Sequence, residues 1–199
     1  MTDATRSTAS ATFASRSGQM APLVVGLGGA VYPDSPAERI LRHCLEARAA
    51  RAGGLIEALR AADAVVIASP SYHSGVSGMV KNALDYLEDL RDDPRAYLDG
   101  RPLGCIACGY GWQAATATLG QLRSIGYALR AWPTPLGIAV NSAWPLLDGT
   151  GRLTDADIAG QLDELARQLM IATDVTAWNR RSRADTASRT DAAARGDAT

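Results

Sequence analysis

The chain has 199 residues, of which 47% are hydrophobic and 21% charged, and its formal net charge is -1. This length suits one domain with a sizeable core. The near-neutral balance excludes a bulk attraction to nucleic acid or to an anionic membrane, and no apolar run approaches the ~20 residues that span a bilayer. The first twenty residues lack the apolar stretch of a secretory signal, so we expect a cytoplasmic protein.

Both ends of the chain lack the apolar periodicity of packed structure. Residues 1–20 are rich in Ser, Thr and Ala, and residues 179–199 carry five Arg and three Asp but no large aliphatic side chain. We therefore predict a disordered leader over residues 1–20, one folded domain over residues 21–178 and a disordered tail over residues 179–199.

Strands and helices alternate within the domain. A short apolar run at 23–27 predicts a buried strand, and the next helix has a marked start, with Ser35 at the N-cap, Pro36 at the first helical position and Glu38 three residues after the cap. The same patterns predict further strands at 64–69, 103–108 and 136–140, and further helices at 55–62, 78–90, 113–130 and after a Thr154 cap.

This alternation is typical of parallel βαβ units, which form an open sheet covered by helices on both faces. The sequence thus predicts an α/β three-layer sandwich with four clear parallel strands. Cys105 and Cys108 form a C-x-x-C inside the third of these strands, where side-chain alternation sends residues three apart to opposite faces. We interpret both as small core residues, not as a redox pair or zinc ligands.

Ligands of such sheets bind at the carboxyl ends of the strands, so the loops after the first three strands are candidate sites. The first loop runs from Gly28 to Ser35. Its glycine turn and capped helix either bind an anion through free N–H groups and the helix dipole, or form a tight turn with a capping box. The third loop, residues 109–113, places two aromatic residues, Tyr110 and Trp112, beside glycines.

The second loop, residues 70–78, is the most informative segment. Glycines let its backbone approach a flat ligand closely, and Tyr72 offers an aromatic face. The segment resembles the signature of the NADPH-dependent FMN reductase family, a strand followed by P-x-Y-x-x-x-x-x-G and K-N-x-x-D. The matching residues are Pro70, Tyr72, Gly78, Lys81, Asn82 and Asp85.

The resemblance implies a flavodoxin-like fold and an FMN site. The isoalloxazine ring of FMN would lie on Pro70, Ser71, Tyr72, His73, Ser74 and Gly75. The FMN phosphate would lie at Gly29, Tyr32 and Ser35. The other edge of the ring would lie against Gly109, Tyr110 and Gly111. Lys81, Asn82 and Asp85 would be structural, and no catalytic residue or metal ligand is assigned. His73 is either a general acid or a residue that shapes the loop. Tyr110 and Trp112 either stack on the ring or anchor the next helix.

The sequence departs from the family pattern at two places. Tyr32 stands where the family has an Arg, and Asp34 brings a negative charge toward the phosphate, a repulsion of up to about 3 kcal/mol. The family's usual second strand is also missing, because residues 49–62 leave no room for it. The first strand would become an exposed edge, so we predict a tight turn around Gly53 and Gly54 and an edge covered by the leader or by a partner chain.

The resemblance implies an oxidoreductase that passes a hydride from NAD(P)H to FMN and then to free flavin, a quinone or a similar small-molecule acceptor, or that supplies a flavin-dependent monooxygenase. It also implies a homodimer or homotetramer. The altered first loop and the missing strand favour an alternative, a degenerate homologue that acts as a partner or scaffold subunit without a cofactor.

Overall fold

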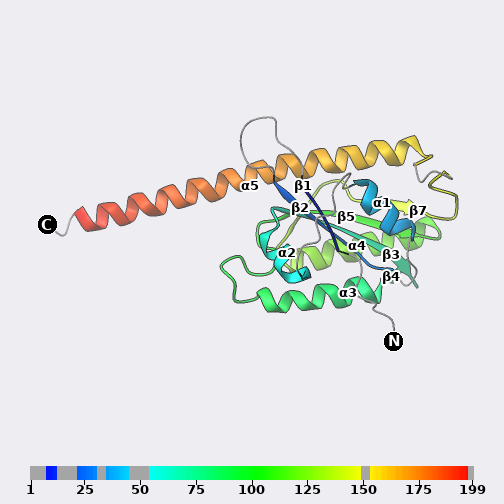
Figure 1. Cartoon of the computed structure of the whole chain (residues 1–199), viewed down its shortest axis with the longest axis horizontal. Helices are drawn as coiled ribbons and strands as arrows, with labels where there is room; N and C mark the ends of the chain where they lie inside the picture. The colour runs from blue at the N-terminus through cyan, green and yellow to red at the C-terminus, as the bar shows by residue number, and fades with distance from the viewer. Residues whose placement is uncertain (1–7, 13–21, 31–34, 45–53, 149–152, 197–199) are drawn as a thin grey trace.

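The computed structural model describes residues 8–12, 22–30, 35–44, 54–148 and 153–196. Its elements follow one another in chain order (Figure 1). They are β1 (Thr8–Thr12), β2 (Leu23–Gly28), α1 (Pro36–Cys44), α2 (Leu55–Ala61), β3 (Ala64–Tyr72), β4 (Gly75–Val76), α3 (Gly78–Asp85), the 3-10 helix η1 (Tyr86–Leu90), β5 (Pro102–Gly109), α4 (Trp112–Ala128), β6 (Trp132–Pro133), β7 (Ile138–Asn141) and α5 (Ala156–Gly196).

The centre of the protein is a parallel sheet, as predicted. β2 pairs with β3, and β3 pairs with β5, both in parallel. The far edge is shared by two short strands, because β6 pairs with the start of β5 and β7 with its end. Four parallel strands of four residues or more, β2, β3, β5 and β7, therefore make up the sheet that the alternating pattern indicated.

The other edge of the sheet is covered by the N-terminal segment. β1 runs antiparallel to β2, with Thr8 opposite Leu27 and Thr12 opposite Leu23. A strand at this position saturates the hydrogen-bonding groups of β2 that would otherwise face solvent. The edge is thus covered by the leader, one of the two predicted solutions, and residues 8–12 are a strand where the sequence analysis expected disorder.

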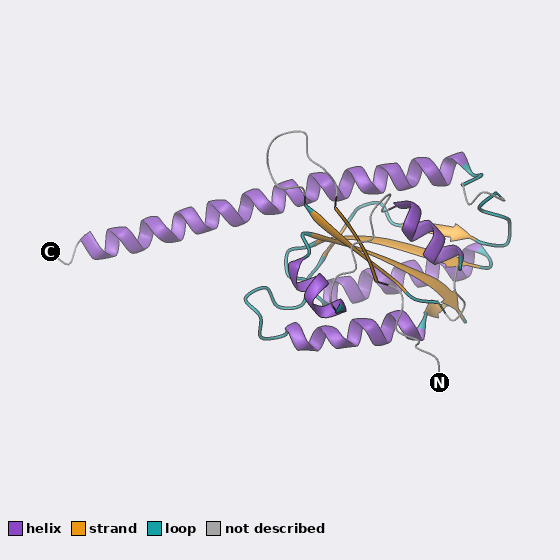
Figure 2. Cartoon of the chain, in the orientation of Figure 1, coloured by secondary structure: helices purple, strands orange, loops and turns teal. Residues whose placement is uncertain are grey.

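Helices cover both faces of the sheet, which gives three layers (Figure 2). On one face, α1 and α5 pack against β-strand residues that include Val66, Ile106 and Val140. On the other face, α2, α3, η1 and α4 pack against residues that include Val65, Ile67 and Leu103. β2, β3 and β5 therefore contribute to two apolar cores, which is why their sequences read as continuous apolar runs.

The two cysteines of β5 lie in different cores. Cys105 packs with the α3 and α4 side and Cys108 with the α1 and α5 side, and both are free thiols. Burial raises the pKa of each thiol to about 12, so neither is a thiolate at neutral pH. The interpretation of both residues as core residues is confirmed.

Two helix ends differ from the sequence analysis. The N-cap of α5 is Asp155, whose Oδ1 accepts hydrogen bonds from the N–H groups of Asp157 and Ile158 at 2.9 and 3.1 Å, so the assignment to Thr154 was wrong by one residue. α5 also continues to Gly196, through most of the expected tail. Alanine and arginine are good helix formers, and extending an existing helix needs no new nucleus.

Candidate functional site

The carboxyl ends of β2, β3, β5 and β7 lie at one edge of the sheet, because these strands are parallel. The three loops predicted to carry function all leave from this edge. Hydrogen bonds between side chains and backbone tie the loops to one another and to α4, and none of the participating side chains carries a formal charge. The candidate site is therefore a surface of backbone and aromatic groups that hydrogen bonds hold in place.

The first loop is held to the second through Gly29. The Ser77 hydroxyl donates a hydrogen bond of 2.7 Å to the Gly29 carbonyl oxygen, and the same Oγ accepts one of 3.2 Å from the Val80 N–H as the N-cap of α3. A Cβ on Gly29 would lie 3.1 Å from the Met79 Cβ, which explains the glycine at this position. Gly29 thus contributes close packing of the first loop on α3.

At the end of the first loop, Ser35 caps α1 as predicted. Its Oγ accepts a hydrogen bond of 3.3 Å from the Glu38 N–H, and the side chain is buried. A hydroxyl group that accepts one bond still has a hydrogen to donate. The predicted phosphate residue Tyr32 and its neighbour Asp34, like the expected turn residue Gly53, lie outside the described residues.

The second loop is a two-residue β-hairpin. Ser71 pairs with Val76 and Tyr72 with Gly75, so β3 turns directly into β4. His73 and Ser74 form the turn with φ angles of 54° and 61°. Positive φ at both central positions is characteristic of a type I′ turn, the tightest way to join two strands. The residues predicted to cradle a ring therefore form a compact, hydrogen-bonded unit.

One side chain of α4 supports this hairpin from both sides. The Gln121 Nε2 donates to the Ser74 carbonyl oxygen at 3.0 Å, and the Gln121 Oε1 accepts from the Val76 N–H at 3.2 Å. At the base of the hairpin, Ser69 Oγ accepts from the Ser77 N–H at 2.9 Å. The sequence analysis missed Gln121, because a lone glutamine on a helix carries no signal of the partner it will reach.

The second and third loops meet at the start of α4. The Ser71 hydroxyl donates to the Ala114 carbonyl oxygen at 2.8 Å and lies 2.6 Å from the Thr118 hydroxyl. A Cβ on Gly109 would come within 2.8 Å of the Ala115 nitrogen and 3.1 Å of the Ser71 Cβ. The end of β5 therefore accepts only glycine here, and the Ser71 hydroxyl is committed to the protein.

The third loop is fixed by Asn141, the last residue of β7. Its Oδ1 accepts hydrogen bonds of 3.0 Å from the N–H groups of both Gly111 and Ala143. Gly111 has a φ of 117° and precedes α4, which consequently begins without a side-chain cap. The sequence carried a signal for Asn141 that we did not use, a polar residue directly after an apolar strand at the carboxyl edge.

Exposed aromatic rings surround this edge. Tyr110, Trp112 and Trp144 are 83%, 59% and 64% exposed, and Tyr72 is half-buried. Large aromatic side chains left in solvent beside backbone N–H and C=O groups are characteristic of binding surfaces. His73 is exposed at the tip of the hairpin turn.

The described part of the chain offers no sign of a metal centre or of a membrane span. No group of three or more metal-ligating side chains occurs there, and none of its helices has the length and apolarity to cross a membrane. Lys81 and Asp85, which belong to the family signature, form an exposed ion pair on the surface of α3. They lie on the helix and do not line the edge of the sheet.

The parallel sheet with helices on both faces, and with its loops braced at the carboxyl edge, defines a flavodoxin-like α/β protein. The fold matches the flavoenzyme NAD(P)H:(acceptor) oxidoreductase FerB from Paracoccus denitrificans with a TM-score of 0.57 and 16% identity, over 74% of this chain and 96% of that one. It also matches a flavodoxin from Pseudomonas aeruginosa with a TM-score of 0.51 and 19% identity, over 73% and 97%.

The sequence assigns the chain to a narrower class within this fold. The profile of the NADPH-dependent FMN reductase family matches residues 23–145, and the chain belongs to this family. An NAD(P)H-dependent FMN reductase of Pseudomonas aeruginosa is 29% identical over 57% of this chain, and an FMN-dependent NADPH-azoreductase of Staphylococcus haemolyticus is 34% identical over 50%. The matches span about half the length of these relatives, 56% and 50%.

Proposed function

We propose that this protein is an NAD(P)H-dependent flavin reductase that binds FMN at the carboxyl edge of its sheet. It would transfer a hydride from NAD(P)H to the flavin and then reduce free flavin, a quinone or a similar small acceptor. Family membership supports the class of reaction, and the arrangement of the second and third loops supports the location. A flavin-dependent monooxygenase that takes up the reduced flavin is the macromolecular partner that fits this activity.

The proposal depends on the hydrogen bonds that fix the second and third loops. Gln121 holds the hairpin at Ser74 and Val76, and Asn141 holds Gly111. Backbone N–H and C=O groups that are fixed before a ligand arrives bind a planar polar edge without the entropy cost of ordering a loop. The exposed rings of Tyr110 and Trp112 offer faces on which an isoalloxazine system can stack.

The residues present fit the two ends of FMN unequally. The ring end has the hairpin backbone and the aromatic faces. The phosphate end has the Ser35 hydroxyl and the N-terminus of α1, but residues 28–35 include no basic side chain. A helix N-terminus contributes about 0.3–1 kcal/mol to binding an anion. We therefore propose that the ring supplies most of the affinity for FMN, and that Gly29 and Ser35 add a minor part.

A bound flavin supplies the hydride chemistry, since it accepts a hydride from a nicotinamide and passes electrons to an acceptor. The chain's own part is to orient the ring and to exclude water from one of its faces. Pro70, Ser71, Tyr72 and Gly75 would form the surface beneath the ring, and Gly109, Tyr110 and Gly111 would border it. His73 and Ser74 would shape the turn, and no side chain of the loops is assigned a proton-transfer role.

Comparing two flavins tests both parts of the proposal. FMN and riboflavin, which lacks the phosphate, are titrated into the protein and followed by flavin fluorescence, and NAD(P)H oxidation is measured with each. We expect both flavins to bind, with affinities within about tenfold of each other. The double variant Tyr32→Arg, Asp34→Gly should tighten FMN by up to about a hundredfold, because it removes the Asp34 repulsion and adds a cation, and should leave riboflavin unchanged.

The alternative function is a partner or scaffold subunit that has lost the cofactor. The absence of a basic residue from the first loop favours it. Its signature is distinct: neither flavin binds, NAD(P)H is not oxidised, and the double variant restores nothing. Any saturable quenching of riboflavin that Gln121→Ala weakens would count against the scaffold.

We also propose that the protein is a homodimer or homotetramer, the assembly that the family resemblance implies. Ile171, Val175 and Trp178 support this proposal, because they form an exposed apolar stripe at i, i+4 and i+7 on the outer face of α5. Light scattering of the wild type and of Val175→Glu tests it, with Gln161→Glu, an exposed position on the same helix, as the matched control. A wild-type mass equal to the monomer would overturn it.

A further inference from the structure

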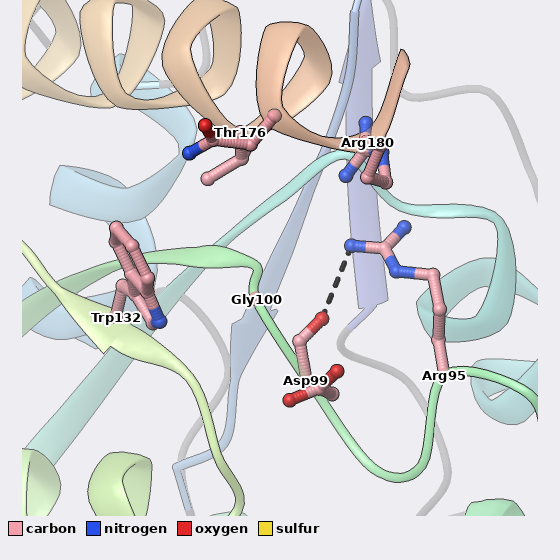
Figure 3. A pocket seen from close by; sticks show the side chains of 7 residues that line it. Arg95, Asp99, Gly100, Trp132, Thr176 and Arg180 are labelled. Carbon is pink, nitrogen blue, oxygen red and sulfur yellow. Dashed lines mark hydrogen bonds between the residues drawn. The ribbon is translucent and has the colours of Figure 1, made fainter. Parts of the chain in front are cut away.

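A pocket of about 170 Å³ lies at the amino-terminal edge of the sheet, at the opposite end from the candidate flavin site. Figure 3 shows the side chains that line it. Trp132 forms one wall. It is the first residue of β6 and pairs with Pro102, the first residue of β5. The other walls come from Arg95, Asp99 and Gly100 and from Thr176, Asn179 and Arg180 of α5. The pocket is smaller than the ~300–1,000 Å³ of drug-sized ligand sites, so it suits a small molecule.

The floor of the pocket is fixed by backbone hydrogen bonds. The N–H of Leu98 donates to the Leu129 carbonyl oxygen at 3.0 Å, that of Gly100 to Arg130 at 3.2 Å, and that of Trp132 to Arg101 at 2.8 Å. These bonds join the segment before β5 to the segment before β6. The pocket walls are therefore held in place without a ligand.

Two guanidinium groups, those of Arg95 and Arg180, lie close together on one side of the pocket (Figure 3). Arg95 donates to the Asp99 carbonyl oxygen at 3.3 Å, which is a backbone group and not a carboxylate. Arg180 pairs with Asp63 at 3.5 Å. Both arginine side chains are partly buried, and Trp132, more than half exposed, lies on the opposite side of the pocket (Figure 3).

A third arginine lies beneath the pocket. Arg101 is 1% exposed, and its guanidinium donates three hydrogen bonds of 2.8–3.2 Å to the carbonyl oxygens of Arg60, Ala62 and Tyr97. These acceptors are neutral, so the Arg101 guanidinium is hydrogen-bonded, but none of these bonds goes to a carboxylate. Three cations thus share this region with two carboxylates, Asp63 and Asp99.

The pKa values of Arg95 and Arg101 reflect first their burial and then the nearby positive charge. Burial and then the nearby Arg180 lower the pKa of Arg95, against the opposing effect of Asp63 and Asp99. Burial, followed by Arg95 and Arg180, lowers the pKa of Arg101 to about 10. An anion between Arg95 and Arg180 would relieve this repulsion, and guanidinium groups are well suited to bind carboxylate and phosphate oxygens.

We propose that this pocket binds a small oxyanion, a carboxylate or a phosphate, with its charge between Arg95 and Arg180 and its apolar body against the Trp132 ring. The Asn179 side chain at the pocket wall adds a hydrogen-bonding group of the right polarity. The site lies on the opposite edge of the sheet from the flavin loops, so its ligand would bind independently of FMN.

Calorimetric titration at low ionic strength tests the proposal, with sodium benzoate and inorganic phosphate as the two oxyanions and benzyl alcohol as the uncharged comparison. We expect at least one oxyanion to bind and benzyl alcohol not to bind. Arg95→Gln should weaken the oxyanion at least tenfold, whereas Arg91→Gln, an exposed arginine of the preceding turn that pairs with Asp92, should not. Trp132→Ala should weaken benzoate more than phosphate.

Two results would overturn the proposal. One is the absence of binding heat with both oxyanions, and the other is an affinity that Arg95→Gln leaves unchanged. Repeating the titration in the presence of saturating FMN separates this site from the flavin site, because displacement by FMN would assign the oxyanion to the other edge and would also refute a separate pocket. If the protein binds an oxyanion but no flavin, the pocket proposal is supported and only the flavin proposal is refuted.

Discussion

The Ser77 hydroxyl donates a hydrogen bond of 2.7 Å to the Gly29 carbonyl oxygen, and this bond joins the first loop of the site to the start of α3. The Ser77 Oγ also caps α3, because it accepts a hydrogen bond from the Val80 N–H. Ser77→Ala should therefore lower the free energy of unfolding by about 1–3 kcal/mol, since it removes a cap and leaves a buried carbonyl group unpaired. Urea unfolding measures this, with Ser124→Ala, an exposed serine of α4, as a control expected to lie within about 0.5 kcal/mol of the wild type.

Gln121 supports the hairpin through two opposite interactions, and two variants separate them. Gln121→Ala removes both and should weaken riboflavin binding several-fold, because the hairpin backbone is no longer fixed. Gln121→Glu keeps the acceptor for the Val76 N–H but loses the donor to Ser74, so its effect should be smaller. Fluorescence titration measures the affinities. Equal affinity in all three proteins would show that the hairpin does not contact the ring.

His73 adopts a φ of 54°, a conformation that Gly adopts most readily and that Asn, Asp and His adopt more often than other residues. His73→Asn should keep the turn and retain the NAD(P)H oxidation rate within about twofold. His73→Gly should raise the free energy of unfolding by up to about 1 kcal/mol through relief of strain. Steady-state NAD(P)H oxidation rates distinguish this from the general-acid hypothesis, which requires both variants to lose most of the rate.

The buried thiols of β5 predict a loss of stability at high pH. Burial raises the pKa of Cys105 and of Cys108 from 9.0 to about 12. In the unfolded chain the thiols ionise above pH ~9, whereas in the native protein they stay protonated until about pH 12. The unfolded state therefore binds fewer protons in this window, and the free energy of unfolding falls by about 1.4 kcal/mol per pH unit for each thiol.

Urea unfolding under reducing conditions at pH 8.5, 9.5 and 10.5 checks this dependence. The wild type should lose stability with pH more steeply than the double variant Cys105→Ala, Cys108→Ala, whose remaining slope reports all the other groups that titrate. Parallel slopes for the two proteins would mean that the thiols are not buried as they are in the structure. Alkylation of native protein should likewise spare both positions.

Elements with a strong local signal were predicted well from the sequence. The apolar runs of β2, β3 and β5 need no tertiary information, because strands buried on both faces carry apolar residues throughout. The start of α1 was equally accessible, since Ser35, Pro36 and Glu38 have defined positions in a helix cap. The cover over β2 was predicted from topology alone, because a parallel strand with a free edge needs a neighbour.

Features that depend on distant partners were not accessible. The Ser, Thr and Ala of β1 have no periodicity, and their strand exists only through pairing with β2. The cap of α5 was assigned to Thr154, but Asp is as good a cap as Thr, and the geometry places Asp155 at this position. In the candidate site, the sequence predicted three loops, but not that the second is a hairpin, that Gln121 holds this hairpin or that Asn141 holds the third loop.

α5 has a further consequence for how the protein behaves in solution. Its 41 residues rise about 1.5 Å each and give a rod of about 60 Å, of which the C-terminal part projects beyond the sheet (Figure 1). A particle of this outline diffuses more slowly than a sphere of equal mass. Elution from a sizing column calibrated with compact standards will therefore overstate the molecular weight, and a single subunit will be mistaken for a larger assembly.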